Sequence, residues 1–229
     1  MPYDVELEDY HEDVLLNSGP KNCLVTGGAG FIGSNIVNKL IKDGHYVRVV
    51  DDLSSGSQYN FKYQTEFYRA DISEEPFLDM FQDIDIVFHL AAFPRVEPSI
   101  QDPIKANRIN VNGTLNVLNA CVKYGVKRLV FTSSSAIYGE ADTPTTEEHS
   151  KNPMSPYALN KLIGEQYCKL YSEIYNLQTV CLRYSNVYGE GQPIEGAYCN
   201  VMGIFEQQKL MGKPMTIVGD GEQRRDFTH

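Results

Sequence analysis

The sequence predicts an α/β protein built on a doubly wound parallel sheet, followed by the beginning of a smaller domain. Three observations predict it: short apolar runs alternate with helical stretches between residues 21 and 184, a glycine-rich turn joins the first run to the first helix, and an aspartate ends the second run. Such alternation gives a parallel sheet with right-handed crossovers and helices on both faces. A length of 229 residues with 42% hydrophobic residues suffices for this core.

The glycine-rich turn spans residues 26–33, Thr-Gly-Gly-Ala-Gly-Phe-Ile-Gly, and follows the apolar run 23–25. Gly27 and Gly30 let the backbone turn sharply and approach a pyrophosphate, while Gly33 lets the following helix pack against the strand. The first N–H groups of a helix have no internal partner, and the helix dipole favours an anion there. The motif alone is also compatible with an ordinary turn between a strand and a helix.

Asp51 separates these two interpretations. It ends the second apolar run, 46–50, and stands 21 residues after Gly30. A carboxylate at the end of the second strand accepts hydrogen bonds from the adenosine ribose hydroxyls and repels a 2′-phosphate. The turn and the aspartate together predict a dinucleotide site that prefers NAD to NADP.

The later elements continue the alternation. Further strands are expected at 66–70, 84–90, 129–131 and 180–182, and helices at 76–82, 103–124 and 156–175. Beyond residue 185 glycine, proline and asparagine become frequent, before a helix near 200–211 and a strand near 215–218. The chain therefore divides into an acidic N-terminal extension (1–20), a dinucleotide-binding domain (21–184) and part of a smaller domain (185–229).

Composition argues against several classes of protein. The chain has no apolar run of about 18 residues, so we expect no membrane span, and its acidic N-terminus does not resemble a signal peptide. The absence of a basic stripe argues against a nucleic-acid partner. The five cysteines lack metal-ligand spacing, so we expect no metal site, and free thiols in a reducing cytoplasm.

Most of the net charge of −10 lies at the N-terminus. Residues 1–20 contain six acidic residues and no lysine or arginine. Such a segment is either an interaction tail or a solvated extension, including one short helix packed by its apolar side chains. We favour the solvated extension.

Candidate catalytic side chains follow the dinucleotide motif. Tyr157 and Lys161 begin the helix 156–175 and, four residues apart, lie on one helix face. A lysine ammonium favours the phenolate of a neighbouring tyrosine, which general-base chemistry near neutral pH needs. A serine cluster, 133–135, follows a predicted strand and can hydrogen-bond the same reacting oxygen. These side chains predict proton transfer coupled to hydride transfer to NAD.

The strand 84–90 ends close to His89 and is followed by Ala91 and Ala92. Open α/β sheets bind ligands at the carboxyl ends of their strands, where small residues let a cofactor approach the backbone. His89 is a candidate catalytic base. The interpretation that we prefer is a strand-end histidine held by a backbone partner.

With these residues in place, the chain resembles the extended short-chain dehydrogenase/reductase family, in its group of NAD-dependent sugar epimerases and dehydratases. The resemblance covers nearly all of residues 21–229. It is carried by TGGAGFIGS (26–34), VVDDLSSG (49–56), HLAA (89–92), TSSSAIYG (132–139), SPYALNK (155–161), LRYSNVYGEGQ (182–192) and GDGEQRRDF (219–227).

The resemblance implies a Rossmann fold and a role for each matching residue. Tyr157 is the implied base, Lys161 its activator and a nicotinamide-ribose ligand, and Ser134 the hydroxyl partner. The implied cofactor-binding residues are Gly27, Gly30, Phe31, Ile32, Gly33, Asp51, Asp52, Asp71, Ile72, Ala91, Ala92, Asn110, Tyr157, Lys161 and Tyr184. The implied substrate-binding residues are Ser134, Asn186, Asn200 and Arg225.

Related sugar 4,6-dehydratases carry an Asp-Glu pair after the catalytic hydroxyl residue, where this chain has Ser135 and Ala136. The resemblance therefore favours C4 epimerisation of a UDP-hexose or UDP-N-acetylhexosamine through a 4-keto intermediate. Another nucleotide-sugar dehydratase or reductase of the family is the alternative. The stretch 196–198, Gly-Ala-Tyr, and the acidic extension incline towards the N-acetylhexosamine branch.

The resemblance also implies a longer substrate domain than residues 185–229 provide. We therefore expect a C-terminally truncated chain, and an NAD-binding module without turnover is the second functional class. Members of the family often form homodimers through their two long helices, here 103–124 and 156–175, packed as a four-helix bundle.

Overall fold

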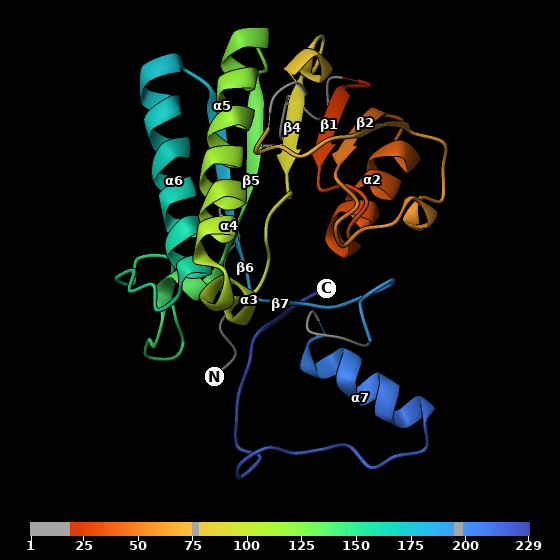
Figure 1. Ribbon diagram of the computed structural model, residues 1–229, viewed down its shortest axis with the longest axis vertical. Coiled ribbons are helices and arrows are strands. Elements are labelled where there is room, and N and C mark those ends of the chain that lie inside the picture. The colour runs from red at the N-terminus through yellow and green to blue at the C-terminus, as the bar shows by residue number, and fades with distance from the viewer. Residues whose placement is uncertain (1–18, 75–77, 195–198) are drawn as a thin grey trace.

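The computed structural model describes residues 19–74, 78–194 and 199–229, and its centre is a six-stranded parallel sheet (Figure 1). The strands are β1 (Asn22–Thr26), β2 (Tyr46–Asp51), β3 (Glu66–Arg69), β4 (Ile86–His89), β5 (Arg128–Ser134) and β6 (Gln178–Tyr184). They lie in the order β3-β2-β1-β4-β5-β6. The winding reverses between β1 and β4, so the carboxyl ends of these strands form the switch point where such sheets bind ligands. The predicted fold class is confirmed.

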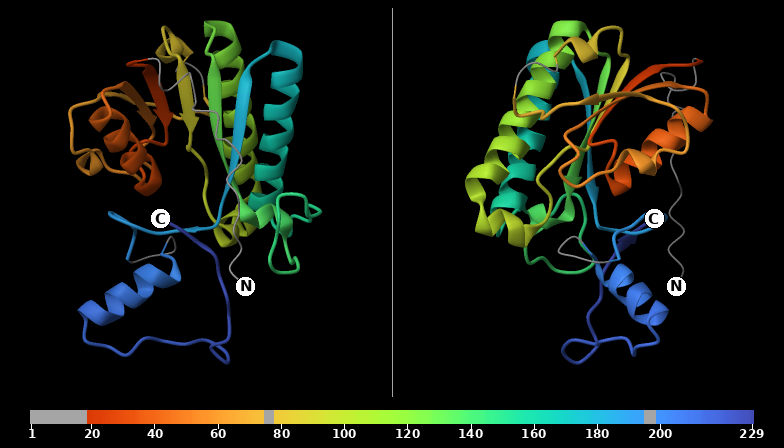
Figure 2. Two further views of the ribbon diagram at one scale, coloured as in Figure 1. Left: turned by 180° about the vertical axis from the view of Figure 1, so that it is seen from behind. Right: turned by 45° about the vertical axis from the view of Figure 1, so that its right-hand side comes forward.

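Helices cover both faces of the sheet (Figure 2). One face carries α2 (Phe31–Lys42), and the opposite face carries α4 (Pro103–Asn107), α5 (Gly113–Tyr124) and α6 (Pro156–Tyr175). Shorter elements are α3 (Val96–Gln101) and the 3₁₀ turns Gln58–Asn60, Leu78–Phe81 and Ser135–Tyr138. A sheet sandwiched in this way needs apolar side chains on both faces of its central strands.

The central strand β1 meets this requirement residue by residue. Leu24 packs into the core with α5 and α6, whereas Cys23 and Val25 pack with α2. At the sheet edge the pattern changes, since Val180 and Leu182 of β6 are 41% and 36% exposed. They lie on the face that carries α2, but α2 packs mainly against β1 and β2.

The predicted helix 103–124 is not one regular α-helix. A π-helical segment, Arg108–Asn112, separates α4 from α5. In a π-helix each backbone N–H bonds five residues back instead of four, which changes the direction in which the following side chains point. Periodicity predicted the span but not this interruption, because one wide turn displaces the apolar pattern by a single residue.

After β6 the chain forms β7 (Asn186–Val187), α7 (Val201–Leu210) and β8 (Phe227–Thr228), with β7 and β8 paired in parallel. The predicted strand near 215–218 is wrong, because these residues form no strand. The Gln208 side chain instead bonds the backbone and hydroxyl of Thr216 at 3.0 and 2.8 Å. The domain boundary at residue 185 stays a prediction.

Two sequence interpretations concern residues that the structure does not describe. Residues 1–18 of the acidic extension and the whole stretch 196–198 lie outside the described residues. In the part of the chain that is described, no helix is long and apolar enough to cross a membrane. The same residues contain no group of three histidine, cysteine or acidic side chains that would hold a metal ion.

Candidate cofactor and catalytic site

The glycine-rich turn fits closely between three strands. A Cβ atom on Gly27 (φ +70°) would lie 2.5 Å from the Ala91 nitrogen, and one on Gly33 would lie 2.1 Å from the Gly27 carbonyl oxygen. At Gly30 a Cβ would meet only that same carbonyl oxygen, at 3.4 Å, among the described residues. Gly30 caps α2 without a side-chain hydrogen bond. The first N–H groups of α2 are therefore open to an anion such as a pyrophosphate.

Asp51 holds this turn in place. Its carboxylate is buried and accepts hydrogen bonds from the backbone N–H of Ala29 at 2.9 Å and of Leu53 at 2.8 Å. Burial raises the pKa of Asp51, while these two hydrogen bonds oppose the rise. Each carboxylate oxygen has a further lone pair, so the same group can also accept from a ribose hydroxyl.

The other residues implied for adenosine lie at the neighbouring strand ends. Asp52 follows β2 and accepts a hydrogen bond from the Ser54 N–H at 2.8 Å. Asp71 and Ile72 follow β3, where Ile72 is buried and Asp71 is half-buried. Burial acts to raise the pKa of Asp71, but hydrogen bonds from Ser73 and the Arg108 guanidinium hold it below its usual range. Asp71 is therefore an ionised acceptor beside Asp51 and Asp52.

His89 joins β1, β4 and α5 through a buried chain of hydrogen bonds. Thr114 donates to the Asn110 carbonyl at 2.7 Å and accepts from His89 Nε2 at 3.0 Å, which leaves His89 Nδ1 to accept from the Thr26 hydroxyl at 2.7 Å. Thr26 in turn accepts from the Ala91 N–H at 3.3 Å. His89 is thus held by two threonine hydroxyls and not by a backbone group. Burial, with a smaller effect of Lys161, lowers its pKa to about 3.

His89 should make the protein acid-sensitive. Because its folded-state pKa of about 3 lies below the ordinary 6.5, the unfolded chain binds the proton more tightly. The stabilisation is complete above pH 6.5 and is lost as the pH falls towards 3, by about 2 kcal/mol between pH 7 and pH 5. Denaturant unfolding at these two pH values should show this slope in the wild type and a smaller one in His89→Gln. His149→Gln, in the 139–155 loop, should keep the slope, and an equal slope in His89→Gln would contradict the assignment.

The loop after β4 is held from the helical layer. Asn110, in the π-helical segment, accepts from the Phe93 N–H at 2.7 Å and donates to the Phe93 carbonyl at 3.0 Å. This pair fixes Ala91 and Ala92 directly beside the glycine-rich turn, as the approach of Ala91 to Gly27 requires. Asn110 thus borders the cleft by holding its wall.

Ser134, Tyr157 and Lys161 come together at the carboxyl end of β5. A hydrogen bond joins Ser134 to Tyr157. The Lys161 ammonium is buried, donates to the Thr132 carbonyl at 2.7 Å, and lies 5.9 Å from the centre of the Tyr157 ring. Tyr184, on the neighbouring strand, hydrogen-bonds Thr132. The three residues predicted as catalytic therefore lie in one group.

The electrostatics of this group differ from the prediction. Burial raises the pKa of Tyr157, and the effects that oppose the rise come from the Ser134 hydrogen bond and from Arg95. The Lys161 ammonium bonds Thr132 and is not among the groups that shift the pKa of Tyr157 here, so its role as activator stays a prediction. Burial also lowers the pKa of Lys161, to about 8. Arg95 was missed by sequence analysis; its backbone has a φ of +78°, which no sequence pattern indicates.

The neighbouring serines point elsewhere. Ser133 donates to buried Glu165 at 2.5 Å, and Glu165 also accepts from Arg183 at 2.8 and 2.9 Å. Arg183 donates further to the Tyr138 hydroxyl at 2.6 Å. Ser135 is exposed. This network was also missed, although a glutamate on the buried face of a helix is a signal that a partner must exist.

The residues implied for the substrate form two groups. Asn186 bonds the Asp226 carbonyl through its side chain at 2.9 Å, and Asn200 bonds the Val187 carbonyl at 2.6 Å while it caps α7. These asparagines hold the segments after β6 together. Arg225 is exposed, and its side chain bonds its own neighbours Arg224 and Gln223. The structure does not bring Arg225 to the catalytic group.

A cavity of about 1140 Å³ lies along α2. Phe31, Ile32 and Tyr184 line it together with Tyr188 and His229, whereas Ser134, Tyr157 and Lys161 do not. The cavity therefore reaches the start of α2 from the flank and is separate from the catalytic group.

Comparison with known proteins shows which family has this geometry. The family model for "NAD dependent epimerase/dehydratase family" matches residues 23–229. A UDP-glucose 4-epimerase from Mycolicibacterium smegmatis is 39% identical over 213 residues, which are 89% of this chain and 68% of the relative. The UDP-N-acetylglucosamine 4-epimerase from Methanobrevibacter ruminantium, solved with UDP-N-acetylmuramic acid, has a TM-score of 0.87 and 40% identity, covering 91% of this chain and 69% of that one.

A similar structure that contains NAD supports the same family and cofactor. The UDP-glucose 4-epimerase from Thermus thermophilus, solved with NAD, has a TM-score of 0.82 and 39% identity over 90% of this chain and 70% of that one. The start of α2, which has no side-chain cap, the open side of Gly30 and the Asp51 carboxylate fit a dinucleotide. NAD is the cofactor, and the chain belongs to the NAD-dependent epimerase/dehydratase family.

Proposed function

We propose that the protein catalyses NAD-dependent inversion at C4 of a UDP-sugar, either UDP-glucose/galactose or their N-acetyl forms. The observation that supports this most is the group of Ser134, Tyr157 and Lys161 at the same carboxyl edge of the sheet as the glycine-rich turn. Bound NAD supplies a reversible hydride acceptor for this chemistry. The residues of the chain then need only bind the sugar and move one proton, without removing water.

Tyr157 is the proposed general base for the sugar 4-hydroxyl. The proton passes from that hydroxyl to the phenolate oxygen as the C4 hydride leaves, which gives a 4-keto sugar. After the sugar turns, the hydride returns to its other face and the phenol gives the proton back. Ser134 hydrogen-bonds the phenolic oxygen and is placed to bond the same sugar oxygen. The buried Lys161 ammonium provides positive charge beside the ring.

The positions after Ser134 favour epimerisation over dehydration. Ser135 and Ala136 cannot serve as the acid and base needed to remove water across C5 and C6. Residues that we propose for the UDP moiety are Asn186, Asn200 and Arg225. The preference for an N-acetylhexosamine stays a prediction, because it rests on residues outside the described part of the chain.

The function is tested by incubating the 229-residue chain with NAD and either UDP-glucose or UDP-N-acetylglucosamine, and identifying the product by NMR. We expect the C4 epimer. A 4-keto-6-deoxy product would overturn the proposal in favour of dehydration. NAD binding without turnover of either sugar would favour the alternative, an NAD-binding module. The chain spans about two thirds of the relatives' length.

We also propose that the protein forms a homodimer through its helical layer. Leu159, Leu170 and Ile174 on α6 are 47%, 43% and 60% exposed, and Ile104 on α4 is 82% exposed. Helices of this kind bury such side chains in a four-helix bundle.

The five cysteines are free thiols, which supports the proposed cytoplasmic location.

Replacing Leu170 and Ile174 together with glutamate should convert the dimer to a monomer, because four buried charges would face each other across the bundle. Light scattering after gel filtration measures the molar mass. Tyr59→Glu, an exposed site outside this layer, is the control and should remain dimeric. A wild-type monomer at all concentrations would contradict the proposed dimer.

A further inference from the structure

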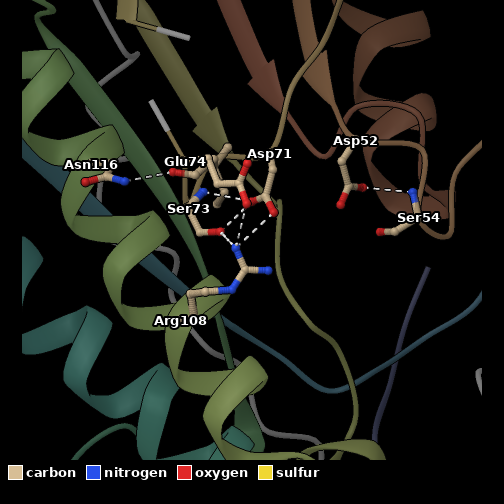
Figure 3. Close-up of polar contacts among 8 residues, drawn as sticks. Asp52, Ser54, Asp71, Ser73, Glu74, Arg108 and Asn116 are labelled. Carbon is tan, nitrogen blue, oxygen red and sulfur yellow. Dashed lines mark hydrogen bonds and ion pairs between the residues drawn. The ribbon is translucent and has the colours of Figure 1, made fainter. Parts of the chain in front are cut away.

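The turn 71–74 lies at the carboxyl edge of the sheet and is partly closed on itself. Ser73 donates to the Asp71 carboxylate through its backbone at 2.8 Å and its hydroxyl at 2.7 Å, and the Glu74 N–H donates to the Asp71 carbonyl at 3.1 Å. Figure 3 shows this turn facing the Asp52–Ser54 turn. Asp51, Asp52, Asp71 and Glu74 thus concentrate negative charge at one edge of the sheet. A cation beside the turn reduces the repulsion between these carboxylates.

Arg108 provides that cation from the helical layer. Its Nη1 donates to Ser73 Oγ at 2.5 Å and lies 3.3 Å from the Asp71 carboxylate and 3.4 Å from the Glu74 carboxylate. One nitrogen therefore reaches three acceptors of a single turn, as Figure 3 shows. The Arg108 side chain is 40% exposed, so the contribution of these contacts to the stability of the whole fold is small. Their effect is concentrated on the conformation of the turn.

Two further contacts fix the same turn against α5. Asn116 donates to the Ile72 carbonyl at 3.0 Å. Gly113 begins α5, and a Cβ there would lie 2.7 Å from Ile72 Cδ1. The turn therefore packs against α5 through Ile72, and Arg108 contacts the turn on its other side.

The π-helical segment explains how one stretch of chain reaches two loops. Arg108 extends to the turn 71–74, while Asn110, two residues later, holds Phe93 in the loop after β4. Both loops border the cleft, on the two sides of the switch point between β1 and β4. Single π turns of this kind are frequent at functional sites.

We propose that Arg108 is a positioning residue for the adenine half of NAD, because it holds Asp71 and Ile72 in the conformation that receives the adenosine. The proposal rests on the placement of the adenosine at these two residues and on no step of the epimerisation. Arg108 contacts neither the catalytic group nor the glycine-rich turn in the described structure. It sets the affinity for the cofactor through the turn, and the chemistry proceeds elsewhere.

The test compares two dinucleotides that differ only at the base. In nicotinamide hypoxanthine dinucleotide an oxygen replaces the adenine amino group, so the donor that the Asp71 carboxylate would accept from under this proposal is lost. We expect the wild-type chain to bind NAD about tenfold more tightly than this analogue by isothermal titration calorimetry. Arg108→Gln should weaken NAD binding about tenfold and bring the two affinities within about twofold of each other.

Arg69→Gln is the matched control. Arg69 is exposed, stands two residues before Asp71, and has no side-chain hydrogen bond or ion pair with the described residues. The Arg69→Gln substitution removes the same charge beside the same turn and should leave the affinities for NAD and for the analogue unchanged. Arg108→Lys keeps the charge on a single nitrogen and should retain part of the preference for NAD. If Arg108→Gln does not fold, the ratio of the affinities for NAD and the analogue is measured in Arg108→Lys instead, and that ratio tests the proposal.

An unchanged preference in the Arg108 variants would overturn the proposal, even if both affinities and the melting temperature fell. General destabilisation of the fold weakens both dinucleotides alike, whereas loss of the turn removes the discrimination between them. The readout is binding alone. A chain that binds NAD without epimerising a sugar still gives the ratio, so failure of the proposed function and failure of this inference are distinguishable.

Discussion

Replacing Tyr157 with phenylalanine is expected to lower the rate of UDP-sugar epimerisation by about 10²- to 10⁴-fold, the usual contribution of a positioned proton-transfer group. The substitution removes the hydroxyl that bonds Ser134 and keeps the ring that fills the partly buried site. NAD binding should persist, since the glycine-rich turn and Asp51 lie on other elements. The measurement is the initial rate of formation of the C4 epimer, with bound NAD determined by calorimetry.

The pH dependence provides a second measurement on the same residue. Burial raises the pKa of Tyr157, so the base form is scarce at neutral pH and the wild-type rate should rise with pH. The Ser134 hydrogen bond opposes that rise in pKa, and Ser134→Ala should therefore move the profile to higher pH. Tyr175→Phe, at the exposed end of the same helix, is the control with wild-type rates. A Tyr157→Phe enzyme with near-normal turnover would show that another group is the base.

Lys161→Met is expected to abolish most turnover while leaving the protein at least as stable as the wild type. Burial lowers the pKa of Lys161 from 10.5 to about 8, so the unfolded chain binds this proton more tightly. The ammonium therefore costs the folded state about 3 kcal/mol at neutral pH. That cost disappears as the pH rises from 8 to 10.5, and stability should rise across this window.

Methionine removes the buried charge and leaves the Thr132 carbonyl without its donor, a loss of about 1–3 kcal/mol. These effects nearly cancel at pH 7, so the melting temperature should be unchanged or higher. The matched control is Lys169→Met on the exposed face of α6, which should keep full activity. A melting temperature several degrees lower in Lys161→Met would show that the ammonium stabilises the fold and would contradict the low pKa.

Local patterns predicted where the candidate cofactor residues lie better than which contacts they make. The spacing between Gly30 and Asp51 predicted a carboxylate beside the glycine-rich turn, and the structure places it there. Sequence alone did not show that the Asp51 oxygens also hold the N–H groups of Ala29 and Leu53. Those bonds depend on how far the turn folds back over β2, which tertiary packing determines.

In α6, too, helix periodicity predicted which residues share a face but not which groups they contact. The i, i+4 spacing predicted that Tyr157 and Lys161 share a face, but the partner of the ammonium depends on the depth of β5 beneath the helix. At that depth the nearest acceptor is the Thr132 carbonyl at 2.7 Å. Arg108 was not predicted at all, because a single charged residue inside a helical stretch is ordinarily a solvated surface position.

The parallel pairing of β7 with β8 makes residues 188–226 a closed loop. Its ends meet where the Asn186 N–H and side chain bond the Asp226 carbonyl at 3.3 and 2.9 Å. Parallel neighbours cannot be joined by a tight turn, so the chain must first lose the entropy of closing a long loop. We expect this pairing to form late in folding and to open first under mild denaturation. The segments that hold Asn186 and Asn200, the asparagines proposed to contact the substrate, would then fold and unfold as one cooperative unit, while the cofactor cleft stays folded.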